Sequence, residues 1–154
     1  MKSSTTSILN PAIYDQDYYL WIQEQVRLLG SGQFQDLDWV NLMGELEDMG
    51  KREKRSVRSN LVVVLMHLLK YQFQPERRSN SWLATLIEHR LRLRDDFQDS
   101  PSLKTYVADP TILKRCYEDA CDRASRETGL PKTNFPENCP YHFDQILDKD
   151  FLPE

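Results

Sequence analysis

Five basic side chains concentrated in residues 47–59, EDMGKREKRSVRS, are the strongest candidates for binding chemistry. They are Lys51, Arg52, Lys54, Arg55 and Arg58. At about 100° per residue, Lys51, Arg55 and Arg58 fall within about 60° of one another on a helix and form one continuous strip. Because guanidinium groups pair with carboxylates and phosphates through two parallel hydrogen bonds, this strip is suited to docking an anion.

Charge is distributed unevenly along the chain. Residues 51–94 hold 11 basic and 3 acidic residues (net +8), residues 1–50 hold 2 and 8 (net −6), and residues 95–154 hold 7 and 13 (net −6), which sum to −4. Three interpretations stay open: pairing with the chain's own acidic flanks, docking to an acidic protein or a second copy, and contact with nucleic acid. The net negative charge of the chain and the lack of a recognisable nucleic-acid-binding motif weigh against contact with nucleic acid. Screening over about 8–10 Å would nevertheless hide distant charges from a local phosphate site.

The candidate binding surface extends from the strip to the turn expected after the same helix. It comprises Lys51, Arg52, Arg55, Arg58, Arg77, Arg78 and Trp82. The leading interpretation is a non-enzymatic protein-interaction module that engages an acidic protein surface or forms a homodimer. The alternative is a nucleic-acid-associated protein that contacts phosphates through residues 51–94, chiefly Lys51, Arg55, Arg58, Arg77 and Arg78.

A cysteine and histidine pattern near the C-terminus is similar in spacing to a zinc site. Cys116, Cys121, Cys139 and His142 give C-x4-C-x17-C-x2-H. On the helix expected there, however, Cys116 and Cys121 lie about 140° apart and cannot easily face one metal. We therefore expect no metal and no cofactor. The odd number of cysteines, without a CxxC pair, is typical of reduced, buried thiols in the cytoplasm.

Glu45, His67 and His89 are weaker candidates for a functional site. Glu45 lies 22 residues before His67, about 33 Å along an unbroken helix, so the two share a site only if the chain bends back near Gly50. His67 and His89 approach each other if their helices form a hairpin, but core histidines bonded to a polar neighbour are the more common case. We assign no catalytic residue, and a metal-dependent enzyme using Glu45 and His67 is the least favoured hypothesis.

We expect the elements that position these residues to be helices, because no segment alternates apolar and polar residues as a half-buried strand does. Residues 1–13 are expected to be a flexible tail, and residues 14–154 a single all-α, bundle-like domain. We expect this domain to be built around a long central helix and an antiparallel helical hairpin, and to end in an irregular C-terminal tail. The expected helices are 14–29, 38–71, 79 or 81 to 97, 111–127 and a short one near 142–147, with a turn at 100–102.

The expected central helix changes in composition along its length. Its first half is charged, whereas residues 61–69, LVVVLMHLL, are apolar almost all round and should be buried on every side. Gly44 and Gly50 each cost about 1 kcal/mol in a helix interior. Because Gly50 lies on the apolar stripe, it marks either a kink or the close approach of another helix.

The chain lacks the sequence motifs of several common functions. Neither GxGxxG nor GxxxxGK[ST] occurs in the chain. The apolar run at 61–69 is too short to span a membrane, and the N-terminus MKSSTTSILN does not have the apolar stretch of a secretory signal. We expect an intracellular protein that does not enter a membrane.

Five strings taken together resemble the Domain of Unknown Function 29 family of small bacterial proteins. They are YDQDYYLWIQEQVRLL, LDWVNLMGELEDMG, HLLKYQFQPERRSNSW, SPSL and ETGLPKTNFPENCPY. The resemblance covers roughly residues 14–153 and implies a helical single domain without an established activity. Where the family usually has two adjacent carboxylates, this chain has Gly44-Glu45, which weakens a catalytic carboxylate pair there.

The polar residues of these five strings concentrate around the central helix and the turn that follows it. Many of their polar residues lie around that helix and the turn that follows it: Glu45, Glu47, Gly50, His67, Lys70, Pro75, Arg77, Arg78, Ser79 and Trp82, with Cys139-Pro140-Tyr141 farther on. Cys116 and Cys121 lie outside the strings, which further weakens a zinc site. If the chain has a functional surface, we expect it between the end of the central helix and the start of the next.

Overall fold

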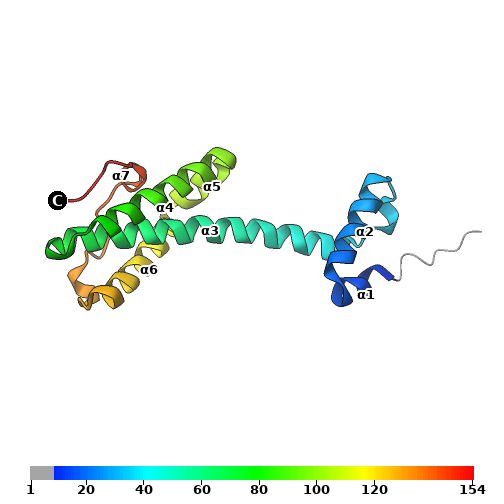
Figure 1. Ribbon diagram of the computed structural model, residues 1–154, viewed down its shortest axis with the longest axis horizontal. Helices are drawn as coiled ribbons and strands as arrows, with labels where there is room; N and C mark the ends of the chain where they lie inside the picture. Colours follow the sequence, from blue (N-terminus) through cyan, green and yellow to red (C-terminus); the bar gives the residue numbers. More distant parts are fainter. Residues whose placement is uncertain (1–8) are drawn as a thin grey trace, which may run out of the picture. The chain divides into compact units, whose positions relative to one another are not determined.

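The computed structural model describes residues 9–154, with side chains from Ile13 onward (Figure 1). Within this range the chain is all α and contains no strand, which confirms the predicted fold class. Three 3₁₀ turns, η1 (Phe34–Asp36), η2 (Pro75–Arg77) and η3 (Lys132–Asn134), accompany the helices. The helices are α1 (Leu9–Gln16), α2 (Tyr18–Gly30), α3 (Trp39–Phe73), α4 (Asn80–Asp99), α5 (Pro101–Ala108), α6 (Pro110–Thr128) and α7 (Phe143–Leu147).

The chain divides into two compact units, and the division falls within α3. We call Met1–Arg52 the N-terminal unit and Glu53–Glu154 the C-terminal unit. Of the expected flexible tail, residues 1–8 lie outside the described residues, whereas residues 9–13 belong to α1. That residues 14–154 fold as one domain stays a prediction.

The N-terminal unit contains the first departure from the expected helices. We expected one helix over residues 14–29, but the chain breaks at Asp17, which separates α1 from α2. The backbone of Asp17 is not helical, and its carboxylate accepts a hydrogen bond from the N–H of Leu20 at 3.0 Å. Aspartate is a strong N-cap, so it starts a new helix here. The α2 helix ends at Gly30, as predicted.

The α3 helix is one α-helix from Trp39 to Phe73 and continues through Gly44 and Gly50. The expected bounds, 38–71, agree within two residues, and no kink replaces the helix at Gly50. Its second half is buried on all sides, as the run at 61–69 predicted. The Gln74-Pro75 pair then ends the helix, because proline cannot donate the next backbone hydrogen bond.

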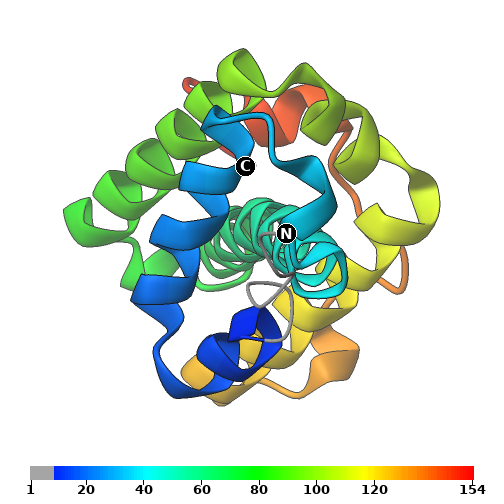
Figure 2. The same cartoon turned by 90° about the vertical axis from the view of Figure 1, so that its right-hand side faces the viewer.

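In the C-terminal unit, α4, α5 and α6 surround the second half of α3, with α4 returning alongside it (Figures 1 and 2). Ser79 caps α4, and Asp109 with Pro110 starts α6, which Gly129 ends in the left-handed conformation with φ of 73°. These boundaries match the sequence prediction. The α5 helix is an addition, since at residues 100–102 we expected a turn with a new cap and gave no helix before residue 111. Pro101 starts a helix there because Leu103 and Val107 can enter the core.

The irregular C-terminal segment is fastened to α4 by Arg90. Arg90 is 4% exposed, and its guanidinium donates hydrogen bonds to three backbone oxygens, those of Gln145, Ile146 and Phe151, at 2.8–3.2 Å. Burial lowers the pKa of Arg90, while Asp148 and Asp150 oppose that shift. One arginine thus satisfies the carbonyls of a segment that makes few backbone hydrogen bonds of its own. Among the described helices, none is both long enough and apolar enough to cross a membrane.

Candidate functional site

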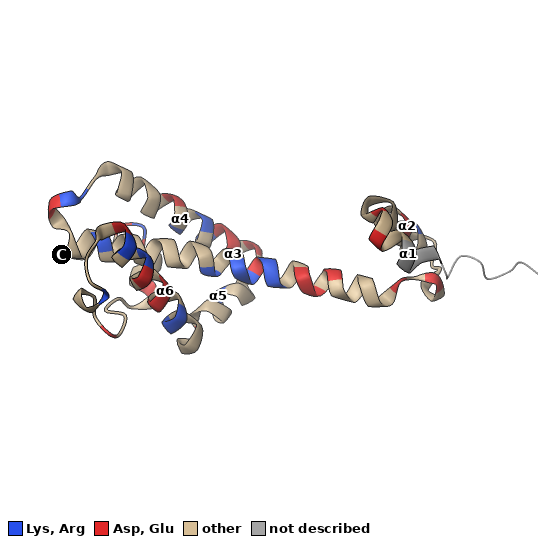
Figure 3. Cartoon of the chain, turned by 90° about the horizontal axis from the view of Figure 1, so that it is seen from below, with Lys and Arg blue, Asp and Glu red and all other residues tan. Residues whose placement is uncertain are grey.

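A groove in the C-terminal unit is formed by neighbouring faces of α3 and α6 and has a volume of about 390 Å³. Figure 3 shows basic segments on both helices. The α3 helix contributes Arg55, Arg58, Ser59 and Val62, and α6 contributes Arg115, Cys116, Asp119 and Arg123. We call these eight residues the arginine groove.

Helical periodicity explains why these side chains share a groove. On α3, Val57 and Leu61 face the core, and positions 55, 58, 59 and 62 follow the adjoining face with spacings of three and four. On α6, Cys116 and Ala120 are buried, and positions 115, 119 and 123 repeat every four residues beside them. Core burial of one stripe on each helix therefore turns its neighbouring stripe toward the groove.

The four arginines of the groove have no carboxylate partner within 4 Å among the side chains that the structure describes. Asp119 lines the same groove but does not reach ion-pair distance from any of them. Four positive charges and one negative charge leave the lining at +3. Elsewhere in this unit basic side chains do pair: Lys70 with Glu127, Arg92 with Glu88, Arg94 with Asp95 and Lys132 with Asp122.

Cys116, at the base of the groove, is not prepared for metal binding or nucleophilic attack. Burial raises the pKa of its thiol to about 11, although nearby Arg58 and Arg115 act in the opposite direction. Burial also raises the pKa values of Cys121 and Cys139. All three cysteines are free thiols, and among the described residues no cluster of His, Cys, Asp and Glu is arranged to hold a metal. The thiolate, the form that binds metals, is therefore scarce at neutral pH.

The structure does not bring the whole predicted binding surface together. Arg55 and Arg58 line the arginine groove, whereas Lys51 and Arg52 belong to the N-terminal unit. The Lys51 amine lies 3.6 Å from the Asp48 carboxylate, three residues earlier on α3. Hydrogen bonding between Tyr18 and Glu45 raises the pKa of Tyr18 and lowers that of Glu45, and the charge of Arg52 opposes the first shift and adds to the second.

Arg77 and Arg78 lie beyond the far end of α3. Arg58 is about 22 Å from that end along the helix axis, so neither residue can reach the groove. Arg78 stacks over the ring of Tyr71, with 4.0 Å from its guanidinium carbon to the ring centroid, and its Nε donates to the Tyr71 carbonyl at 2.8 Å. Arg77 is exposed.

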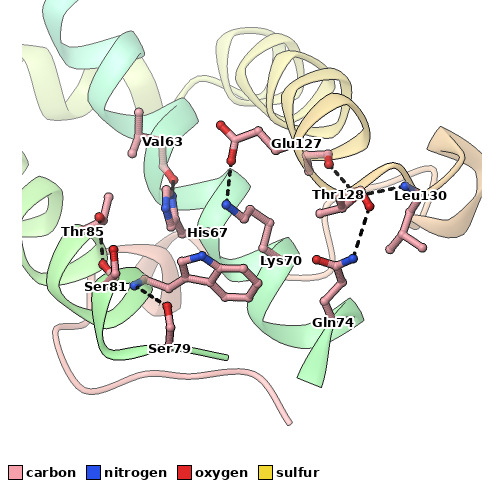
Figure 4. Close-up of polar contacts among 12 residues, drawn as sticks. Val63, His67, Lys70, Gln74, Ser79, Ser81, Thr85, Glu127, Thr128 and Leu130 are labelled. Carbon is pink, nitrogen blue, oxygen red and sulfur yellow. Dashed lines mark hydrogen bonds and ion pairs between the residues drawn. The ribbon is translucent and has the colours of Figure 1, made fainter. Parts of the chain in front are cut away.

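Trp82, near the start of α4, lies over the amine of Lys70, and the ion pair of Lys70 with Glu127 joins α3 to α6 (Figure 4). The Lys70 amine is 2.6 Å from the Glu127 carboxylate and 4.6 Å from the centroid of the Trp82 ring. Lys70 is buried, so this pairing neutralises a charge that would otherwise be costly. Trp82 therefore covers the buried amine of an ion pair whose carboxylate is 49% exposed, and it does not line the arginine groove.

His67 and His89 each have a polar neighbour of their own. The Nδ1 atom of His67 lies 2.9 Å from the Val63 carbonyl, and that of His89 lies 2.8 Å from Asn60 Oδ1. Burial is the main cause that lowers the pKa of both rings, which favours neutral imidazoles at pH 7. The α3 helix is unbroken at Gly50, so the bend that a site with Glu45 and His67 requires does not occur.

Within the N-terminal unit, the carboxylate of Glu45 accepts hydrogen bonds from two tyrosines. The hydroxyls of Tyr14 and Tyr18 donate to its two oxygens at 2.6 and 2.7 Å. These bonds lower the pKa of Glu45 and raise that of Tyr14 to about 12. An ionised carboxylate with both oxygens bonded is a structural acceptor, and it connects α1 and α2 to α3.

Sequence reasoning found half of the arginine groove and missed the other half. Arg55 and Arg58 stood out because their segment is basic. Arg115 and Arg123 lie in a segment of net charge −6, which concealed them. Their spacing around Asp119 on one face of α6 is the signal that could have identified them.

Fold and site together define an all-α protein with a positively charged groove between two helices. A family model described as "Domain of unknown function DUF29" matches residues 13–152 of the chain. The protein therefore belongs to the DUF29 family, which confirms the resemblance seen in the sequence. No curated protein and no solved structure matches the chain.

Proposed function

We propose that this protein is a non-enzymatic interaction module that binds an acidic protein surface through the arginine groove. One observation carries the proposal: four guanidinium groups line one groove, and none has a carboxylate partner among the described side chains. Guanidinium forms bidentate pairs with carboxylates, and arginine is enriched at protein interfaces. A row of Asp or Glu side chains supplies the matching charge.

The extent of the groove supports a protein partner over nucleic acid. A nucleic-acid backbone presents a charge every few ångströms, and its binders contact a long track of phosphates. Beyond the groove, Arg77 lies past the end of α3, and Arg78 is held on Tyr71. A net charge of −4 would also oppose a long polyanion. The groove fits a short cluster of carboxylates better.

The test is fluorescence anisotropy with a labelled oligoglutamate peptide, compared with duplex DNA and single-stranded RNA of similar charge. The groove variant is Arg58→Glu/Arg115→Glu. A matched control, Arg77→Glu/Lys104→Glu, makes the same charge change on exposed residues outside the groove. We expect the peptide to bind, the groove variant to lose at least tenfold in affinity, and the control to change little.

Two results would contradict the proposal. The first is oligoglutamate binding that is absent at low salt or equally reduced by both variants. The second is tighter binding to nucleic acid with a steeper salt dependence, because that slope reports the phosphates neutralised and would favour a nucleic-acid function. Circular dichroism of each variant confirms that the helices remain formed.

A further inference from the structure

A second pocket of the C-terminal unit lies among α4, α5 and the segment that runs from α7 to Lys149. It shares no lining residue with the arginine groove. Its volume is about 300 Å³, at the lower end of the range for small-molecule sites. Since a water molecule occupies about 30 Å³ in the liquid, the pocket has room for a ligand of roughly ten non-hydrogen atoms.

The lining of this pocket combines apolar walls with basic side chains. Leu91, Phe97 and Leu147 supply the apolar residues, and the other lining residues are all Arg or Lys. The surface is nevertheless mainly carbon, because the long hydrocarbon stems of arginine and lysine cover it while their charged ends reach water. Leu91 is 39% exposed, and Phe97 and Leu147 are half-buried. An apolar ligand would remove these three side chains from water.

The charges around the pocket are positive in sum. Its lining contains four basic residues and no acidic one, which gives +4. Arg94 and Lys149 each pair with the aspartate that follows, Asp95 at 3.0 Å and Asp150 at 3.6 Å, so the count is +2 when these two carboxylates are included. Both pairs are exposed, and exposed pairs are weak. Lys104 has no carboxylate partner within 4 Å among the described side chains.

Arg90 places a buried positive charge at the same pocket. Its three hydrogen bonds go to neutral backbone carbonyls, and no described carboxylate lies within 4 Å of it. Asp148 and Asp150 act on it only from a greater distance. Buried arginines are ordinarily paired. Of the five N–H groups of a guanidinium, two remain for a ligand. An anion in the pocket would supply the close counter-charge that Arg90 lacks.

From these observations we propose that this pocket binds a small amphipathic carboxylate. The apolar body of the ligand lies against Leu91, Phe97 and Leu147, and its carboxylate faces Arg90 and Lys104. An inorganic anion would leave the apolar walls in water, and a neutral apolar molecule would leave the charges without a partner. The site is separate from the arginine groove, and neither proposal depends on the other.

The first test compares octanoate with octanamide, which has the same size and shape but carries no charge. Octanoate has about ten non-hydrogen atoms, as many as the pocket can hold. Each compound is titrated into the full chain, and the backbone amide chemical shifts are followed by NMR. We expect octanoate to shift amides mainly within residues 90–104 and 145–149. Octanamide should bind roughly tenfold more weakly, or less, because it makes no charge-assisted hydrogen bond.

Two variants test the walls and the charge separately. Leu91→Trp fills the pocket with a larger side chain, and its control is Ile87→Trp, one turn earlier on α4 at an exposed residue outside the lining. Lys104→Glu reverses a charge of the lining, and its control is Lys114→Glu, at an exposed residue outside the lining. Leu91→Trp and Lys104→Glu should each weaken octanoate binding by roughly tenfold or more, whereas both controls should change it little.

Three results would overturn the proposal. The first is that octanoate shifts no amides, or shifts only amides of the N-terminal unit, whose exposed apolar side chains could bind it without a pocket. The second is that octanamide binds as tightly as octanoate. The third is that Leu91→Trp or Lys104→Glu binds octanoate as tightly as the unmodified protein. The amide spectrum of each variant also reports whether it is folded.

Discussion

The two units use the same long helix in different ways. The part of α3 in the C-terminal unit is surrounded by α4, α5 and α6, and its apolar side chains make a core. The part in the N-terminal unit has a comparable apolar stripe, but its large side chains remain exposed. The comparison teaches that a helical stripe of the same spacing can become part of a core or stay exposed. Which of these it becomes depends on what the rest of the chain brings to it.

Polar contacts replace burial in the N-terminal unit. Trp21 Nε1 donates to Asp38 at 3.0 Å, the Asp38 N–H donates to Gln25 at 2.9 Å, and Glu45 accepts from two tyrosines. The rings of Tyr14, Tyr18 and Trp21 pack together. Since a typical hydrogen bond contributes only about 1 kcal/mol net, we expect this unit to be the less stable of the two.

The largest effect should come from the core of the C-terminal unit. Leu65 is 0% exposed, so Leu65→Ala should lower the free energy of unfolding by about 3–5 kcal/mol, through lost burial and the cavity left behind. Urea denaturation followed by circular dichroism measures this. Ile87→Ala, on an exposed position, should stay within about 0.5 kcal/mol of the unmodified protein. Similar losses in both variants would show that burial does not distinguish these positions.

A somewhat smaller effect is expected at Arg90. Arg90→Leu leaves the carbonyls of Gln145, Ile146 and Phe151 without their donor and should cost about 2–3 kcal/mol. Hydrogen exchange should show faster opening of residues 143–152, while α3 keeps its protection. Arg92→Leu, at an exposed ion pair on the same helix, is the control and should change little. Unchanged exchange in the C-terminal segment would mean that Arg90 does not fasten it.

A substitution at Gly50 sharpens the contrast between the buried and the exposed part of α3. Gly50→Ala should raise the free energy of unfolding by about 1 kcal/mol, because alanine is the better helix former and its Cβ meets nothing. Urea denaturation followed by circular dichroism measures this effect. A variant that is less stable than the unmodified protein would show that a side chain is not accommodated at residue 50.

The smallest effect on global stability should come from Glu45→Gln. Removing the charge should let the pKa of Tyr14 fall from about 12 toward its ordinary value of 10, which ultraviolet difference titration measures. Global unfolding should barely change. Glu47→Gln, which removes the same charge beside it, should leave the tyrosine titration as it was.

The directions in which the pKa values of Tyr14 and Glu45 are shifted give the pH dependence of the hydrogen bond between them. The pKa of Tyr14 is raised, so its contribution to stability is complete below pH 10 and is lost as pH rises through about 12. The pKa of Glu45 is lowered from 4.5, so its contribution is complete above pH 4.5 and is lost as pH falls through the lower, folded-state value. Local hydrogen exchange of α1 and α2 should quicken at both extremes. If exchange does not change at either extreme, this contact does not hold α1 and α2 in place.

Local signals predicted most of the helix boundaries. Ser79, Asp109-Pro110, Gly129 and Gln74-Pro75 act within a few residues of themselves, so their effect can be read from neighbouring positions. The break at Asp17 was missed because aspartate occurs both within helices and at caps, and only its geometry distinguishes the two. The α5 helix was missed because it is short and is stabilised by the burial of Leu103 and Val107.

The sequence by itself determined the all-α class, the approximate bounds of α3, the burial of residues 61–69 and the basic character of residues 51–58, because periodicity, caps and composition are local properties. The sequence left open whether α3 continues through Gly50, and the structure shows that it does. Only the tertiary structure decided which charges are paired. Lys70 of α3 pairs with Glu127 of α6, while Arg55 and Arg58 share a groove with Arg115, Asp119 and Arg123 and form no ion pair among the described residues. An ion pair depends on a few ångströms between side chains far apart in sequence, and that distance is set by how the helices pack.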